Sequence, residues 1–192
     1  MKAKAIWVVL FASALMTGCA FSPQKANLNP TIVSSPSSEG QGVTVAIRVV
    51  DERPSKSLGR RGTAYGAAAE ITAGVDLEQL VSSKIGEALR TKGFNVVGAN
   101  DAGAAKLSVE IRLLEYSTST GFWTGGVQIQ GALKAIASKS GNTYEQMYRS
   151  NKEERVMVVP TAEKNEVWIN AALSDVLTQL IADPKLISFL AG

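Results

Sequence analysis

The stretch KLSVEIRLLEY, residues Lys106–Tyr116, alternates apolar and polar residues and decides the fold class. The apolar side chains of one face are Leu107, Val109, Ile111 and Leu113. Because successive side chains of a strand point to opposite faces, this pattern predicts a half-buried strand. Residues 127–137 alternate in the same way. The sequence KSGN at 139–142 is typical of a hairpin turn, and residues 143–158 then supply a third, more polar strand.

Further strands are expected toward the N-terminus. Residues 43–50, VTVAIRVV, alternate strictly and end at DERP, residues 51–54, because proline cannot continue a strand ladder. Residues 63–71 and 94–97 indicate two more short strands.

Two amphipathic helices complete the pattern. Asp76 is placed as an N-cap for a helix over residues 76–92, and Gly93 as its stop. Thr161 is placed to cap a second helix that ends at Pro184, and residues 186–190 form a short apolar tail that packs back on the domain. We therefore expect an α+β two-layer sandwich, with a mostly antiparallel sheet and both helices on one face.

The N-terminal segment indicates export. Lys2 and Lys4 precede an apolar run over residues 5–16, which is shorter than the roughly 20 residues that span a bilayer but suits a signal peptide. The run ends in LMTGC, residues 15–19, which resembles the lipobox of bacterial lipoproteins. We expect residues 1–18 to be removed and Cys19, the single cysteine of the chain, to carry the lipid. Residues 20–42 are rich in Ser, Pro, Asn and Gly, which predicts a flexible tether before a single domain at 43–192.

The chain resembles the YajG family of bacterial lipoproteins. The resemblance rests on the lipobox, residues 29–32 (NPTI), the strand that begins at Gly42 and leads to Asp51 and Arg53, the placement of the two helices, and residues 187–190 (ISFL). It implies a palmitate-bearing lipoprotein and transfers no catalytic residue. In enteric-type lipoproteins the absence of aspartate after the cysteine, where this chain has Ala20, implies an outer-membrane anchor facing the periplasm.

Composition argues against several classes of protein. Histidine is absent, and the single cysteine allows neither a disulfide within the chain nor a cysteine-based zinc site, so we expect no metal and no cofactor. The formal net charge of +3 falls to +1 once Lys2 and Lys4 are removed, which does not favour a nucleic-acid partner. No spacing of carboxylates or serines indicates an enzyme, and a wall hydrolase is the least favoured hypothesis.

Two segments are candidate contact surfaces. Arg53, Lys56, Arg60 and Arg61 lie within nine residues and are candidate anion-binding residues, unless the loop is simply solvated. Asp51 and Arg53, two residues apart, are expected to pair and fix the exit of this loop. Phe122 and Trp123 lie between glycines and are candidate partner contacts, unless they fold back over the edge of the core.

These observations favour a membrane-anchored, non-enzymatic lipoprotein that contacts an envelope protein or the cell wall. The alternative is a binding module for an anionic envelope component, such as peptidoglycan or lipopolysaccharide.

Overall fold

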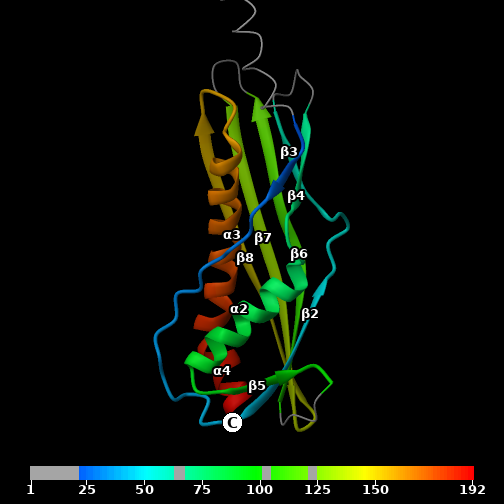
Figure 1. The fold of residues 1–192 in the computed structure, drawn as a ribbon. Coiled ribbons are helices and arrows are strands. Elements are labelled where there is room, and N and C mark those ends of the chain that lie inside the picture. Colours follow the sequence, from blue (N-terminus) through cyan, green and yellow to red (C-terminus); the bar gives the residue numbers. More distant parts are fainter. Residues whose placement is uncertain (1–21, 63–67, 101–104, 121–124) are drawn as a thin grey trace, which may run out of the picture.

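A computed structural model describes residues 22–62, 68–100, 105–120 and 125–192 (Figure 1). The strands are β1 (Gln24–Ala26), β2 (Thr44–Asp51), β3 (Ser57–Arg61), β4 (Ala69–Ala73), β5 (Asn95–Gly98), β6 (Ala105–Thr120), β7 (Gly125–Lys139) and β8 (Asn142–Val156). The helices are α2 (Leu77–Thr91), α3 (Ala162–Ala182) and α4 (Pro184–Ala191).

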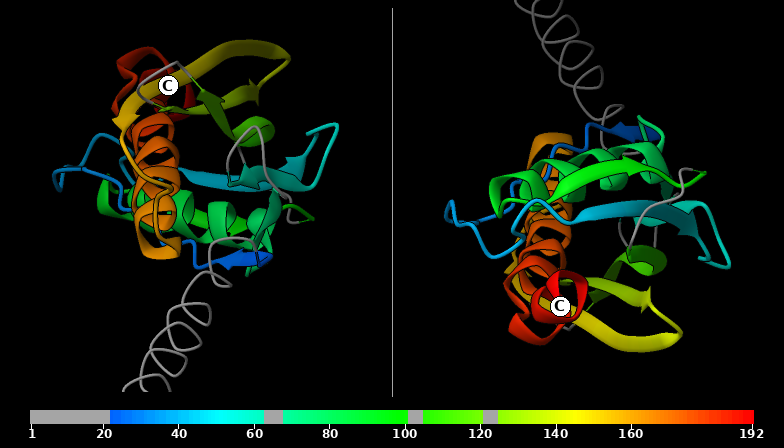
Figure 2. Two further views of the ribbon diagram at one scale, coloured as in Figure 1. Left: turned by 90° about the horizontal axis from the view of Figure 1, so that it is seen from above. Right: turned by 90° about the horizontal axis from the view of Figure 1, so that it is seen from below.

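The long strand β6 organises the sheet. Along one edge it pairs with β7 over its whole length, and β7 pairs in turn with β8. Along its other edge the first half of β6 pairs with β2, and in its second half Tyr116 pairs with Gly59 of β3, which gives the order β1-β4-β3-β6-β2-β5 on that side. The sheet therefore divides at β6 and curls around the helices (Figure 2).

The expected two-layer sandwich with a mostly antiparallel sheet is wrong, because the sheet is mixed and curled. The β6–β7–β8 meander is antiparallel as predicted, but β2 runs parallel to both β5 and β6, and β1 runs parallel to β4. The reason lies in the connection between β2 and β5, which contains α2. A helical crossover returns the chain in the same direction, and neighbouring strands joined by one are parallel.

The two predicted helices are confirmed, with their caps. The Asp76 side chain accepts a hydrogen bond from the Gln79 amide, and that of Thr161 accepts one from the Lys164 amide. Pro184 follows α3 as expected, but it also begins a further helix, α4, because proline lacks only an N–H that the first helical turn leaves unpaired. Asp183 caps α4, and both Tyr144 and Tyr148 donate hydrogen bonds of 2.7 Å to its Oδ2 atom.

The alternation of β6 changes face halfway along the strand. Leu107, Val109 and Ile111 are buried as predicted, whereas the next buried side chains are Leu114 and Tyr116 rather than Leu113. The register with β7 shifts between Ile111 and Leu113, so one extra residue is accommodated there as a β-bulge. The bulge moves every later side chain of β6 to the opposite face from the one that simple alternation predicts.

The segment expected to be a flexible tether packs on the domain over residues 22–42. The strand β1 pairs with β4, and Ala26 and Leu28 are buried in the core. Beyond them the chain runs along α3, where the amides of Asn29, Thr31 and Val33 each donate to one helix side chain. Residues 37–42 then hydrogen-bond to the C-terminal end of α2.

The spacing of amide donors along the extended segment matches the spacing of acceptor side chains along α3. The accepting side chains along α3 are Asn170, Ser174 and Thr178, spaced four residues apart. Four helical residues rise about 6 Å, and two extended residues advance about 6.6 Å, so every second amide of the extended chain meets an acceptor. Polar side chains of α3 therefore satisfy the backbone of a segment whose own polar composition suggested disorder.

Candidate functional site

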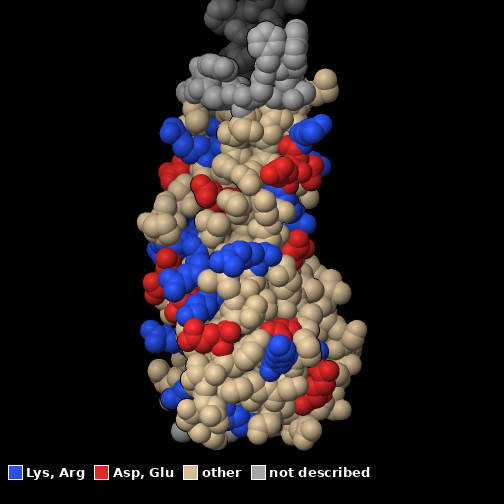
Figure 3. All heavy atoms as spheres, turned by 180° about the vertical axis from the view of Figure 1, so that it is seen from behind, with Lys and Arg blue, Asp and Glu red and all other residues tan. Residues whose placement is uncertain are grey.

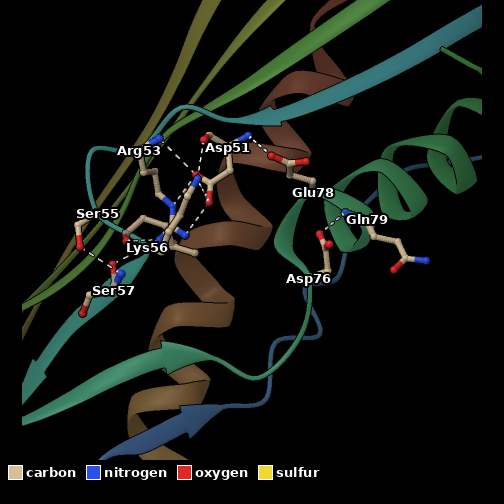
Figure 4. Close-up of polar contacts among 9 residues, drawn as sticks. Asp51, Arg53, Ser55, Lys56, Ser57, Asp76, Glu78 and Gln79 are labelled. Carbon is tan, nitrogen blue, oxygen red and sulfur yellow. Dashed lines mark hydrogen bonds and ion pairs between the residues drawn. The ribbon is translucent and has the colours of Figure 1, made fainter. Parts of the chain in front are cut away.

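The basic loop that follows β2 is organised around Asp51 (Figure 4). Arg53 Nε and Nη2 donate to Asp51 Oδ1 and Oδ2, each at 2.9 Å, and the two side chains are only 4% and 8% exposed. Lys56 Nζ lies 3.0 Å from Asp51 Oδ2 and also donates to the Asp51 backbone carbonyl at 2.7 Å. The expected pairing of Asp51 with Arg53 is therefore present, as a bidentate ion pair.

The contacts of Asp51 also shift the pKa of its carboxyl group. Burial by itself would raise the pKa of this carboxyl, but the hydrogen bonds from Arg53 and Lys56 outweigh it and lower the pKa to about 2. The carboxylate is thus ionised throughout the physiological range. Its negative charge is paired with Arg53 and Lys56, two of the cations proposed to bind an external anion.

The four candidate anion-binding residues do not converge on one free surface. Arg53 is occupied by Asp51, and Arg60 turns its guanidinium to the backbone carbonyl of Ala68 at 2.9 Å. Arg61 is only 6% exposed. Lys56 and Arg60 are both exposed, and Lys56 is paired with Asp51. The ion pairs of Asp51 hold this loop at the end of β2, and anion binding by these four residues stays a prediction.

A buried polar network fixes the N-terminal strand to the rest of the domain. Asn165, which is fully buried at the start of α3, donates to Gln24 Oε1 at 3.1 Å and accepts from the Tyr116 hydroxyl at 2.8 Å. Gln24 Nε2 donates in turn to the Ala162 carbonyl at 2.8 Å. Burial raises the pKa of Tyr116 to about 12, against a smaller opposing effect of the Arg61 charge, so its hydroxyl remains a donor. The strand that follows the lipidation motif is therefore fastened at one defined end of the molecule.

The end of the domain at which α3 begins and β1 is bonded to it also carries an apolar surface. Strand β8 ends at Val156, two residues before the predicted boundary, and this leaves Met157 and Val158 outside the sheet ladder with exposures of 89% and 78%. A hollow of about 370 Å³ lies beside them and is lined by residues that include Gly62, Val127 and Val156–Pro160. We call this surface, made by Met157, Val158 and the hollow, the apolar end. Sequence reasoning missed it because residues 157 and 158 were assigned to the strand that precedes them.

Three of the residues singled out from sequence lie outside the described part of the chain: Cys19, Phe122 and Trp123. The strand ends that flank the last two, Thr120 and Gly125, pair with each other where β6 and β7 meet. Within the described ranges no helix is long and apolar enough to cross a membrane, and no three potential metal-ligating side chains gather at one place.

Comparison with known proteins gives a family and a fold. A family model described as uncharacterized lipoprotein matches residues 30–191. No curated protein matches the chain. Among solved structures, protein XCC0632 from Xanthomonas campestris is similar, with a TM-score of 0.59 and 14% identity over 85% of this chain and 95% of that one. This likeness shows the fold alone.

Two further solved structures match more loosely. They are a putative neuraminyllactose-binding hemagglutinin homolog from Helicobacter pylori (TM-score 0.46, 14% identity, covering 85% of this chain and 96% of that one) and lipoprotein GNA1162 from Neisseria meningitidis (TM-score 0.33, 12% identity, covering 72% and 97%). With TM-scores below 0.5, neither likeness bears on what this chain does.

Proposed function

Because the chain belongs to this family of uncharacterized lipoproteins, we propose that it is a non-enzymatic envelope protein, anchored by acylated Cys19 in the outer membrane and facing the periplasm. Its role is to hold a small folded domain at the membrane surface, where the domain contacts an envelope protein or the cell wall. The narrower assignment to the YajG family belongs to this proposal as well.

One observation carries the proposal. The first described strand, β1, begins at Gln24, five residues after Cys19, and is paired with β4 and bonded to α3. Five extended residues reach at most about 17 Å. A lipid on Cys19 therefore keeps the domain close to the bilayer, whereas a free tether over residues 20–42 would let it range several times further.

The proposed anchor has a direct test. Cells that express the full chain are labelled with palmitate, and their membranes are separated on a sucrose gradient. The chain is expected to take up label and to sediment with the outer membrane. Cys19→Ala is expected to lose both the label and the membrane association. Retained membrane association without label would contradict the proposal.

Ala20→Asp is the matched variant for the choice of membrane. It leaves Cys19 and the described domain unchanged, and it introduces the residue that retains enteric-type lipoproteins in the inner membrane. In an enteric host we expect labelled protein to move to the inner-membrane fraction. An unlabelled product would mean that the anchor itself is misassigned.

The interaction role is tested separately by crosslinking in intact cells. A crosslinkable residue at an exposed position of β8, for example in place of Gln146, is expected to capture one specific envelope component. The same residue on a chain without its anchor, Cys19→Ala, should not capture it. Capture of nothing from the anchored chain would argue against an interaction protein.

A further inference from the structure

The apolar end lies where the chain leaves the domain toward Cys19. Gln24 bonds to Ala162 in the first turn of α3, and α3 begins only four residues after Val158. In Figure 1 the start of α3, the end of β8 and strand β1 all lie toward the upper end of the molecule, whereas the C-terminus lies at the lower end. The exposed apolar side chains and the attachment point of the anchor therefore share one end of the domain.

We propose that the apolar end rests on the lipid surface that holds the anchor, with the side chains of Met157 and Val158 inserted among the lipids. This inference rests on the proposed lipidation of Cys19. The short segment between Cys19 and the described domain indicates that a lipid surface covers the apolar end. Ser22, the first described residue, is three residues from Cys19, which corresponds to about 10 Å at full extension. A lipid surface that close to Ser22 is the nearest apolar phase to Met157 and Val158.

Exposure supports insertion rather than incidental placement. Met157 is the most exposed of the five large hydrophobic residues that stand out from the described surface, and Val158 is its neighbour in sequence. Exposed apolar area of this kind is unfavourable in water and becomes favourable when it enters an acyl phase. The hollow beside the two residues adds an apolar wall to the same surface.

Charge indicates what kind of lipid contact this is. The charged residues next to the apolar end are mixed in sign: Glu153 and Glu154 with Arg155 on β8, and Glu163 with Lys164 on α3. Figure 3 shows the side of the molecule opposite to Figure 1, where Lys and Arg are likewise interspersed with Asp and Glu. Without a patch of one sign, attraction to anionic headgroups contributes little. Contact is expected to depend on apolar insertion and to be insensitive to lipid charge.

Spin labels at two sites test the orientation. Val158→Cys and Val33→Cys introduce a thiol at valines of nearly equal exposure, 78% and 76%, and Cys19 does not compete for the label once it carries its lipid. Val33 is the matched control, because its amide is bonded to Thr178 toward the far end of α3. Each labelled full-length lipoprotein is reconstituted in phosphatidylcholine vesicles and in vesicles that also contain phosphatidylglycerol. Collision rates are then measured with dissolved oxygen, which enriches in the bilayer, and with a water-soluble nickel chelate.

The expected result is a several-fold higher oxygen-to-nickel ratio at residue 158 than at residue 33, equal in both kinds of vesicle. Equal and water-like ratios at both sites, in protein that floats with the vesicles, would overturn the inference while leaving the anchor intact. Failure to float would instead sink the proposed anchor. Spin–spin broadening at residue 158 that grows with the protein-to-lipid ratio would show that a second copy of the chain covers this surface, and it would also overturn the inference.

Discussion

Replacing Arg53 by alanine should destabilise the domain much more than an ordinary loop substitution. The change leaves the Asp51 carboxylate, whose side chain is 8% exposed, without the two 2.9 Å hydrogen bonds from its guanidinium partner. Removing one partner of a buried ion pair typically costs about 3–5 kcal/mol, because the remaining charge stays buried. Lys56, which is largely exposed, still lies 3.0 Å from Asp51 Oδ2 and compensates part of this charge, so the lower end of the range applies. We expect Arg53→Ala to fall in this range at pH 7.

The pKa of Asp51 gives an independent magnitude. A pKa of about 2 in the folded state, against 3.8 for the unperturbed group, corresponds to roughly 2–3 kcal/mol of stability. Because the folded-state pKa is the lower one, this stability is present above about pH 4 and is lost as the pH falls toward 2. The deficit of Arg53→Ala should therefore shrink over the same interval, since the orphaned carboxyl can then take up a proton.

Urea denaturation of the wild-type chain and the variant, between pH 7 and about pH 2.5, measures both quantities. Arg112→Ala is the matched control. It removes a half-exposed pair with Glu110, whose side chains are 43% and 21% exposed, and should cost clearly less than Arg53→Ala, about 1 kcal/mol. A joint change of Asp51→Asn and Arg53→Met should recover most of the loss, because no charge is then left buried. A deficit no larger than that of Arg112→Ala, or one that does not change with pH, would refute the reasoning.

Three further predictions concern other parts of the fold. Gly59→Ala should abolish or severely reduce folding yield, because a Cβ there would lie 1.8 Å from the Tyr116 carbonyl oxygen, whereas Gly141→Ala, with nothing within 4 Å, should cost only about 1–2 kcal/mol in urea for its positive φ. Tyr116→Phe should lower the free energy of unfolding by about 1–3 kcal/mol and speed hydrogen exchange in β1, because the side-chain Oδ1 atom of Asn165 loses its donor. Unchanged exchange would show that the network does not hold β1. Asp183→Ala removes the cap of α4 and the acceptor of two tyrosines, and should lower the thermal midpoint by an amount equivalent to at least about 1 kcal/mol.

Local features of the fold could be predicted because each depends on residues close together in the chain. The caps at Asp76 and Thr161 need only a side chain and an amide three residues apart, and both are observed. The antiparallel meander of β6, β7 and β8 was likewise predictable, because alternation and a short turn at Ser140–Gly141 define it locally.

For the candidate sites, the availability of a side chain depends on partners distant in sequence, which the sequence alone does not show. Four cations in nine residues suggested an anion site, but the positions of Arg60 and Arg61 depend on how β3 pairs with β4. The apolar end could not be recognised while Met157 and Val158 were assigned to a strand. Alternation alone does not say where pairing with β7 stops, and the register places the last pair at Gly125 and Val156.

By itself the sequence determined the two capped amphipathic helices and the strands with a regular period, since these depend on composition and spacing along the chain. Tertiary structure decided the parallel pairing around β2, the reversal of faces at the bulge of β6, and the docking of residues 22–42 on α3 and α2. The physical reason is that each of these needs two segments to match in register. The amides at Asn29, Thr31 and Val33 are satisfied only because acceptors 141–145 residues away have the same repeat distance.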